Sequence, residues 1–479
     1  MATISETLSY DDVLLVPAYS DVLAGRADTK THLVSDIYLN IPVLSAAMDT
    51  VTESELAIAI ALEGGAGVIH RNLSPEVQAA HVGKVKRFLN WIIDDPLTVS
   101  PDQTIADVKK IIGEYNISGL PVVKEGKLVG IITGRDLRFC GDDRVLVQEA
   151  MTKDPVVANN FPTPESAREK FFIHKIEKLP VVDAAGSLTG LITVKDMEKK
   201  RLSPNAAIDK TGRLITGAAI SPQDYKKRIP LLMENYADFV VLDTAHGDSE
   251  SVIEAVRAIK REFNIPVIGG NVATAEGTKR LIDAGADAVK VGVGPGSICT
   301  TRIVAGIGVA QLTAVMDCVE EADKYGIPVI ADGGIKYSGD ISKAIAAGAS
   351  TVMIGNMLAG LKESPGREII FEGRIFKSYR GMGSLGAIKE GSGDRYQMSK
   401  NDAPVPEGIE GRVPYKGELK PFLYQLVTGL KKGMSYCGCP DIDSMKKYRK
   451  FGKISSAGLR ESHAHDISIT QEAPNYSHG

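Results

Sequence analysis

A cysteine on a glycine-rich loop is the side chain in this sequence best suited to chemistry. Cys299 follows an apolar run, Ala288–Val293, and the turn Gly294-Pro295-Gly296, and it stands beside the hydroxyls of Ser297 and Thr301. A buried strand that ends in such a turn can present the next residues to a substrate in a fixed orientation. A lone cysteine is most often structural. This position, however, favours a nucleophilic thiol.

Repeated strand and helix patterns surround this loop. Amphipathic stretches such as Ser251–Glu262 and Glu276–Ala284 alternate with eight short apolar runs that end in small or polar residues. The runs are Ile41–Met48, Gly65–His70, Leu214–Ile220, Phe239–Ala245, Ile265–Asn271, Ala288–Val293, Ile327–Asp332 and Thr351–Ile354. Eight such units predict an α/β fold in which a parallel sheet closes into a (β/α)8 TIM barrel. The alternative is an open doubly wound sheet, but no GxGxxG fingerprint opens an early helix.

A (β/α)8 barrel has its active site where the carboxyl ends of the strands meet. One mouth should therefore collect Ser45, Met48, Asp243, Asn271, Cys299, Asp332 and Gly355. The loops after the seventh and eighth strands carry Gly333-Gly334 and Gly355-Asn356, whose backbone N–H groups can approach a phosphate. Asp332 could accept hydrogen bonds from a ribose diol or cap a turn, and its glycine neighbours favour the diol.

An internal repeat interrupts the barrel pattern. About 140 residues separate the second and third runs, where an ordinary unit needs about 30. Within them Leu120-Pro121-Val122-Val123 recurs as Leu179-Pro180-Val181-Val182, and GIITGRDL recurs as GLITVKDM. We therefore expect a catalytic barrel of residues 1–90 and 202–479 and an inserted module of residues 91–201, with repeats of about 91–148 and 149–201.

The inserted repeat resembles paired cystathionine β-synthase (CBS) domains, also called a Bateman domain. That resemblance implies binding of purine nucleotides such as ATP or GTP, with Asp136 and Asp196 near a ribose. A pair that acts only as a spacer and binds no ligand is the alternative.

Composition and charge exclude several classes of function. The net charge is −4 and no block of Lys and Arg occurs, so we expect no nucleic-acid partner. No apolar run approaches the roughly 20 residues that span a bilayer, and the start, MATISETLSYDD, does not resemble a secretory signal. Five cysteines suit a reducing cytoplasm. Cys437-Gly438-Cys439 has no second pair nearby and is a weak zinc pattern.

The segment Glu372–Lys420 is rich in Gly, Lys and Pro and has no sustained period. We expect a lid or a disordered loop there, with Gly381-Met382-Gly383-Ser384 as its hinge.

Long motifs make the likeness to one family specific. SAAMDTVTE, GPGSICTT, IADGGI, KSYRGMGSLGA and DRY resemble the family of inosine monophosphate (IMP) dehydrogenases and guanosine monophosphate (GMP) reductases, over nearly all 479 residues. The resemblance implies that Cys299 attacks C2 of IMP, that hydride passes to NAD, and that a flap then assists hydrolysis to xanthosine monophosphate (XMP), the committed step of guanine nucleotide synthesis.

The resemblance also implies roles for single residues. Catalysis would involve Cys299, Thr301, Arg395, Tyr396 and Glu407. IMP would contact Ser45, Met48, Ser297, Asp332, Gly334, Gly355, Asn356, Tyr379, Gly381, Met382, Gly383 and Glu407, where serine is frequent in the family at the position of Asn356. NAD would contact Asp243, Thr244, Ala245, Asn271, Gly292, Gly294 and Thr301.

A potassium ion and an oligomer are implied as well. Carbonyls of Gly294, Gly296 and Cys299 would bind the cation together with Glu461, Ser462 and His463 of a neighbouring subunit. The family is tetrameric, and the CBS pair could join tetramers into an octamer.

Two other functions remain as alternatives. A GMP reductase shares the barrel, the cysteine loop and the phosphate site, but it lacks the Arg395-Tyr396 pair of the flap. A nucleotide-sensing protein with a silent barrel is opposed by the intact Cys299, Thr301, Asp332 and Arg395.

Overall fold

The computed structural model describes residues 4–89, 92–93, 96–115, 117–159, 162–396, 405–471 and 473–476. The chain divides into two compact units, Met1–Phe88 with Asn205–Gly479, and Leu89–Pro204. Trp91, the expected start of the insert, lies outside the described residues. Within the described part of the chain no helix is long and apolar enough to cross a membrane.

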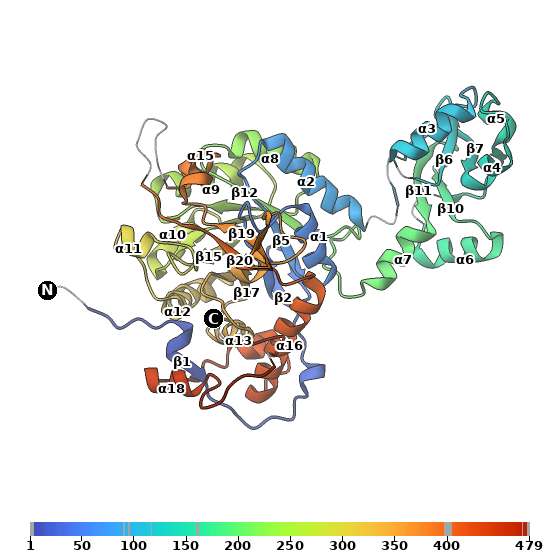
Figure 1. Ribbon diagram of the computed structural model, residues 1–479. Coiled ribbons are helices and arrows are strands. Elements are labelled where there is room, and N and C mark those ends of the chain that lie inside the picture. The colour runs from blue at the N-terminus through green and yellow to red at the C-terminus, as the bar shows by residue number, and fades with distance from the viewer. Residues whose placement is uncertain are drawn as a thin grey trace. The chain divides into compact units, whose positions relative to one another are not determined.

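The larger unit is a closed barrel of eight parallel strands, as the alternating runs predict (Figure 1). In barrel order the strands are β12 (Thr216–Ile220), β13 (Phe239–Asp243), β14 (Val267–Val272), β15 (Ala288–Val291), β16 (Val329–Asp332), β17 (Thr351–Ile354), β4 (Val43–Ser45) and β5 (Ala66–Ile69). Pairing of Ile354 with Ser45 and of Ala218 with Ile69 closes the ring.

Helices surround the strands and connect them (Figure 1). The longer ones are α1 (Ser54–Leu62), α2 (Pro75–Phe88), α8 (Tyr225–Glu234), α9 (Glu250–Glu262), α10 (Ala275–Asp283), α12 (Gln311–Ala322), α13 (Ser338–Ala346) and α16 (Leu419–Cys437). Short helices are α11 (Thr301–Val304), α14 (Asn356–Ala359), α15 (Leu385–Lys389), α17 (Ile442–Lys446) and α18 (Ser456–Glu461), with 3-10 turns η1 (Tyr10–Asp12), η2 (Ala24–Arg26), η3 (Asp323–Tyr325) and η4 (Ser392–Tyr396). The expected amphipathic stretches are thus α9 and α10.

Apolar side chains fill the amino-terminal part of the barrel. Leu33, Val34 and Leu39 belong to the hairpin of β2 (Thr31–Val34) and β3 (Ile37–Leu39), and they share one buried cluster with Ile268 and Ile330 of the barrel strands. The strands β1 (Val13–Leu15) and β21 (Phe451–Lys453) pair separately. The hairpin packs against this end of the barrel, and the cavity that contains Cys299 lies at the opposite end, where the strands finish.

The expectation of a lid or disordered loop over Glu372–Lys420 is wrong where this segment forms regular secondary structure, and residues 397–404 lie outside the described part of the chain. A three-stranded antiparallel sheet forms from β18 (Glu368–Phe371), β19 (Arg374–Arg380) and β20 (Glu410–Pro414). Every residue of β18 is exposed, so its apolar side chains give no burial pattern that the sequence could reveal.

The smaller unit has two similar halves. Each contains a helix, an antiparallel strand pair and a second helix. The first half comprises α3 (Ile105–Tyr115), β6 (Gly119–Lys124), β7 (Lys127–Thr133), α4 (Gly134–Phe139), α5 (Val147–Ala150) and β8 (Thr152–Lys153); the second comprises β9 (Ala158–Asn159), α6 (Pro164–His174), β10 (Lys178–Val182), β11 (Leu188–Thr193) and α7 (Val194–Leu202). Each half has its own cluster of buried apolar side chains. Ile105 and Val108, on one face of α3, belong to the cluster of the first half.

Candidate active site

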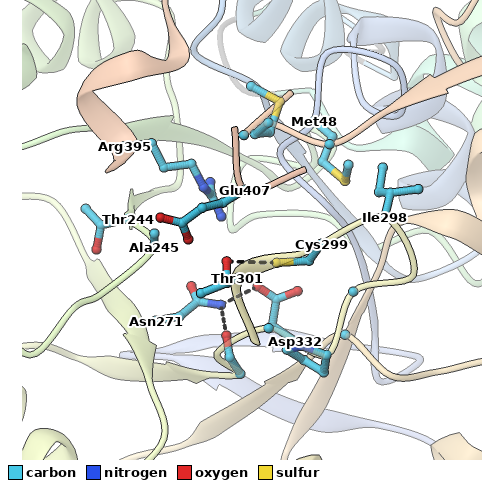
Figure 2. A pocket seen from close by; sticks show the side chains of 18 of the residues that line it. Met48, Thr244, Ala245, Asn271, Ile298, Cys299, Thr301, Asp332, Arg395 and Glu407 are labelled. Carbon is cyan, nitrogen blue, oxygen red and sulfur yellow. Dashed lines mark hydrogen bonds between the residues drawn. The ribbon is translucent and has the colours of Figure 1, made fainter. Parts of the chain in front are cut away.

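A cavity of about 130 Å³ opens at the carboxyl ends of the barrel strands (Figure 2). Residues at or just after the ends of five barrel strands, and residues of β19 and the segment after it, line it: Met48, Thr244, Ala245, Asn271, Gly292, Gly294, Pro295, Gly296, Ile298, Cys299, Thr301, Asp332, Gly333, Tyr379, Gly381, Met382, Gly383, Arg395 and Glu407. Most of the residues that the sequence assigned to a site therefore meet in one place.

The thiol of Cys299 faces this cavity. Its Sγ lies 3.1 Å from Oγ1 of Thr301, the first residue of α11 (Figure 2). The backbone N–H of Cys299 donates to the carbonyl of Gly296 at 3.0 Å, which closes the turn after β15. Arg302 donates through Nε to the carbonyl of Val293 at 3.1 Å and lies near enough for its charge to interact with that of the thiolate. A fixed thiol beside a hydroxyl and a cation is suited to nucleophilic attack.

The other cysteines are less suited to this role. Burial raises the pKa of Cys318 to about 12 and that of Cys439 to about 11, and it also raises the pKa of Cys437. Cys140 is partly exposed but belongs to the smaller unit. Cys299 is the cysteine that combines access with a structured polar loop.

A buried lysine forms the polar floor of the site. Lys290, on β15, is 1% exposed, and its Nζ donates to Asp332 Oδ2 at 2.7 Å, to Asp243 Oδ1 at 3.1 Å and to Asn271 Oδ1. Nδ2 of Asn271 donates to the same Oδ2 of Asp332 at 2.9 Å (Figure 2). These bonds hold one oxygen of the Asp332 carboxylate and leave the other for a ligand.

Glycines on neighbouring loops keep backbone groups accessible. Gly333 and Gly334 have φ values of 93° and 82°, a left-handed conformation that glycine adopts without strain. A Cβ on Gly333 would lie 2.8 Å from the ring of Pro295, and one on Gly355 would lie 3.1 Å from Met48 Sδ. Side chains at these positions would crowd the cavity or the loops that form it.

Two parts of the segment after β19 reach the cavity. The carbonyl of Arg395 accepts a hydrogen bond from the N–H of Ala245 at 3.2 Å, and its guanidinium forms an ion pair with Asp243. Glu407 is held by its backbone: its N–H donates to Gly383 at 3.1 Å. Figure 2 shows the side chains of Arg395 and Glu407 beside the space that Cys299 faces.

Six expected site residues lie beside the lining and do not form part of it: Ser45, Asp243, Ser297, Gly334, Gly355 and Asn356. Ser45 is fully buried, and its Oγ accepts a hydrogen bond from Thr52 at 2.9 Å. Burial raises the pKa of Tyr379 to about 12, and a hydrogen bond with Ser297 opposes this rise. The side chain of Tyr396 lies outside the described part of the chain.

The residues expected to bind a cation are divided between two places. Gly294, Gly296 and Cys299 lie on the cavity loop, whereas Glu461 ends α18 and does not line the cavity. Ser462 follows α18, and the ring of His463 packs against Tyr337, with centroids 5.8 Å apart.

The smaller unit has a separate cavity of about 430 Å³. Asp136 lines it, and its Oδ2 accepts hydrogen bonds from the N–H and the hydroxyl of Thr133, both at 2.7 Å, at the start of α4. Basic side chains of Arg135, Arg138, Lys175 and Lys178 line it too. The side chain of Asp196 lies outside the described residues.

Reasoning from the sequence missed some residues of the larger site. Lys290 carried a signal, because a charged residue inside an otherwise apolar buried strand needs partners. Ile298 gave none beyond its position next to Cys299. The ion pair of Asp49 and Arg380, next to Met48 and Tyr379, could not be read from residues more than 300 positions apart.

The barrel and the accessible thiol at its mouth define a (β/α)8-barrel enzyme. The model of the IMP dehydrogenase / GMP reductase domain matches residues 7–465. Inosine-5'-monophosphate dehydrogenases of Halalkalibacterium halodurans and Aquifex aeolicus are 55% and 56% identical; the alignments cover 98% and 99% of this chain and 98% of each relative. A crystal structure of GMP reductase C318A from Trypanosoma brucei, in complex with guanosine 5'-monophosphate, matches with a TM-score of 0.89 and 41% identity over 97% of this chain and 99% of that one. The chain belongs to the IMP dehydrogenase / GMP reductase family and is an oxidoreductase.

Proposed function

We propose that this chain oxidises IMP to XMP with NAD as the hydride acceptor, through a covalent bond between Cys299 and the purine. The single observation that carries the proposal is the thiol of Cys299, 3.1 Å from the Thr301 hydroxyl, in a cavity that Asp332 also lines. The relatives named inosine-5'-monophosphate dehydrogenase, at 51–56% identity, support this substrate.

The cavity offers groups suited to each part of a nucleoside monophosphate. The free oxygen of Asp332 would accept from a ribose hydroxyl, because its Oδ2 already accepts from Asn271 and Lys290. Ser45, Met48, Ser297, Gly334, Gly355, Asn356, Tyr379, Gly381, Met382, Gly383 and Glu407 would hold the remainder. Tyr379 would donate as a neutral phenol, because burial raises its pKa to about 12.

The proposed reaction has two stages, oxidation at C2 of IMP and then hydrolysis of the covalent intermediate. The Cys299 thiolate forms a bond to C2 of IMP, and the C2 hydrogen then leaves as hydride, which leaves a covalent thioimidate. Water next forms a bond to C2, the C–S bond breaks, and the thiolate is regenerated as XMP is released. Water thus supplies the new oxygen, and two electrons leave with the hydride.

NAD, when bound, supplies the acceptor for this hydride. We assign its binding to Asp243, Thr244, Ala245, Asn271, Gly292, Gly294 and Thr301. These residues fit such a group, because Ala245, Gly292 and Gly294 add little side-chain bulk to the wall. Asn271 and Asp243 supply polar atoms next to it.

The flap would serve the hydrolytic step. Arg395 pairs with Asp243, a residue that we assign to the dinucleotide, so the flap and the dinucleotide would compete for one carboxylate. This supports hydrolysis after the reduced dinucleotide has left, with Arg395, oriented by Tyr396, activating the water. Glu407 would be a second proton acceptor.

Further proposals concern assembly and regulation. Gly294, Gly296 and Cys299 would bind potassium with Glu461, Ser462 and His463 of a neighbouring subunit, within a cytoplasmic homotetramer that the insert could join into an octamer. The insert, residues 91–201, would bind ATP or GTP as a CBS pair, with Asp136 and Asp196 near the ribose.

GMP reduction is the second candidate, because a GMP reductase shares the fold over nearly the whole chain. The Arg395–Asp243 pair favours oxidation, since a reductase has no thioimidate to hydrolyse. Purified protein should therefore form NADH and XMP from IMP and NAD. Oxidation of NADPH by GMP, with no NADH formed from IMP, would instead identify a reductase.

A further inference from the structure

An ion pair joins the loop after β4 to the end of β19, next to residues that line the candidate active site. Asp49 follows Met48 directly, and Arg380 lies between Tyr379 and Gly381. Nε of Arg380 lies 3.2 and 3.1 Å from the two carboxylate oxygens of Asp49, and Nη2 lies 2.7 Å from Oδ2. Each partner is therefore adjacent in the chain to residues that line the cavity.

This pair is largely buried and is held by further hydrogen bonds. The Asp49 side chain is 6% exposed and that of Arg380 is 20% exposed. Asp49 Oδ2 also accepts from Nδ2 of Asn72 at 2.8 Å, and the backbone N–H of Arg380 donates to Thr50 at 3.3 Å. A guanidinium that meets a carboxylate with two nitrogens fixes orientation as well as distance.

We infer that the Asp49–Arg380 pair is a positioning pair that sets the affinity of the site for nucleoside monophosphates. It holds the backbone on either side of Arg380 against the loop of Met48. Tyr379 OH lies 4.0 Å from Met48 Sδ, so a small shift between the loops would change the gap that receives the substrate. Neither Asp49 nor Arg380 lines the cavity, so both act through their neighbours. The inference rests on the proposed function for the identity of the substrate.

A second carboxylate also contacts Arg380. Glu390, just after α15, pairs with its guanidinium and is 61% exposed. An exposed ion pair contributes little to stability, because water competes for both groups. The buried Asp49 should therefore dominate the effect.

Three variants and a matched control test this inference. Arg380→Lys and Asp49→Asn should each raise KM for IMP about tenfold and leave kcat within about threefold, because each loses the two-point contact that fixes the loop. KM for NAD should stay unchanged in Arg380→Lys and Asp49→Asn. Glu390→Gln should leave KM for IMP unchanged. Arg228→Lys is the control, since Arg228 is also buried and pairs with Asp224 at 2.6 Å, and none of its partners lines the cavity. It should lower thermal stability without changing either KM.

Calorimetric binding of IMP should show the same loss for Arg380→Lys and Asp49→Asn. A lower amount of folded enzyme would reduce the apparent kcat but would not change KM, so a purely structural role predicts the pattern of Arg228→Lys. Unchanged KM and binding in both variants, or a larger effect from Glu390→Gln, would overturn the inference. If wild-type protein neither binds nor oxidises IMP, the proposed function fails instead.

Discussion

Replacing Lys290 with methionine should destabilise the barrel strongly while keeping its shape. The lysine is 1% exposed and its ammonium meets Asp332, Asp243 and Asn271. Methionine fills a similar volume but leaves two carboxylates without this counter-charge. Removing one partner of a buried ion pair costs about 3–5 kcal/mol. The lower end should apply, because Asn271 still donates to Asp332 and Arg395 still pairs with Asp243.

Urea unfolding followed by circular dichroism would measure this loss. The chain has two compact units, so only the transition of the barrel should move, and that of the smaller unit should stay in place. Lys290→Arg keeps the charge and should lose less. A change below about 0.5 kcal/mol in Lys290→Met, within the range of an ordinary surface substitution, would refute this account of the polar floor.

Four further outcomes are expected. Cys299→Ser should abolish turnover and keep IMP binding within about tenfold, because ribose and phosphate contacts carry affinity; more than a few per cent of wild-type activity would contradict this role. Arg395→Ala should keep the first burst of NADH and slow the steady state, and loss of the burst would place Arg395 in an earlier step. Because the pKa of Tyr379 is raised above 10 to about 12, its neutral phenol should contribute stability that is full below pH 10 and is lost as the pH rises through about 12. In an absorbance titration, Tyr379→Phe should then remove only an ionisation well above pH 10. Replacing residues 91–201 with a short Gly/Ser linker should leave an active barrel without any response to ATP or GTP; a surviving response would place the effector elsewhere.

The barrel could be predicted from the sequence because its strands are buried on both faces. Such strands appear as short apolar runs. Seven of the eight expected runs contain a whole barrel strand, and the eighth, Ile265–Asn271, ends one residue before β14 does. The carboxyl-end rule then brought Met48, Asn271, Cys299 and Asp332 to one mouth, where the structure places them. Position in the barrel therefore accounts for much of the candidate site.

Features that depend on pairing between distant segments could not be predicted. The residues of β18 are exposed, so the sheet of β18, β19 and β20 left no periodic signal. This sheet forms through backbone pairing of β19 with β18 and with β20. The Asp49–Arg380 pair likewise depends on how two loops meet in space. The roles of Arg395 and Glu407 were expected from the family resemblance, because a charged residue on a loop is usually only solvated.

Trapping the covalent intermediate would test the central claim most directly. Purified Arg395→Ala would be mixed with IMP and NAD, quenched in acid during the burst, and digested for mass spectrometry. We expect the peptide that contains Cys299 to gain the mass of IMP less two hydrogens, one lost as hydride and one as the thiol proton, at an occupancy that matches the NADH formed. NADH formed with no adduct on Cys299, or an adduct on another cysteine, would contradict the proposed mechanism.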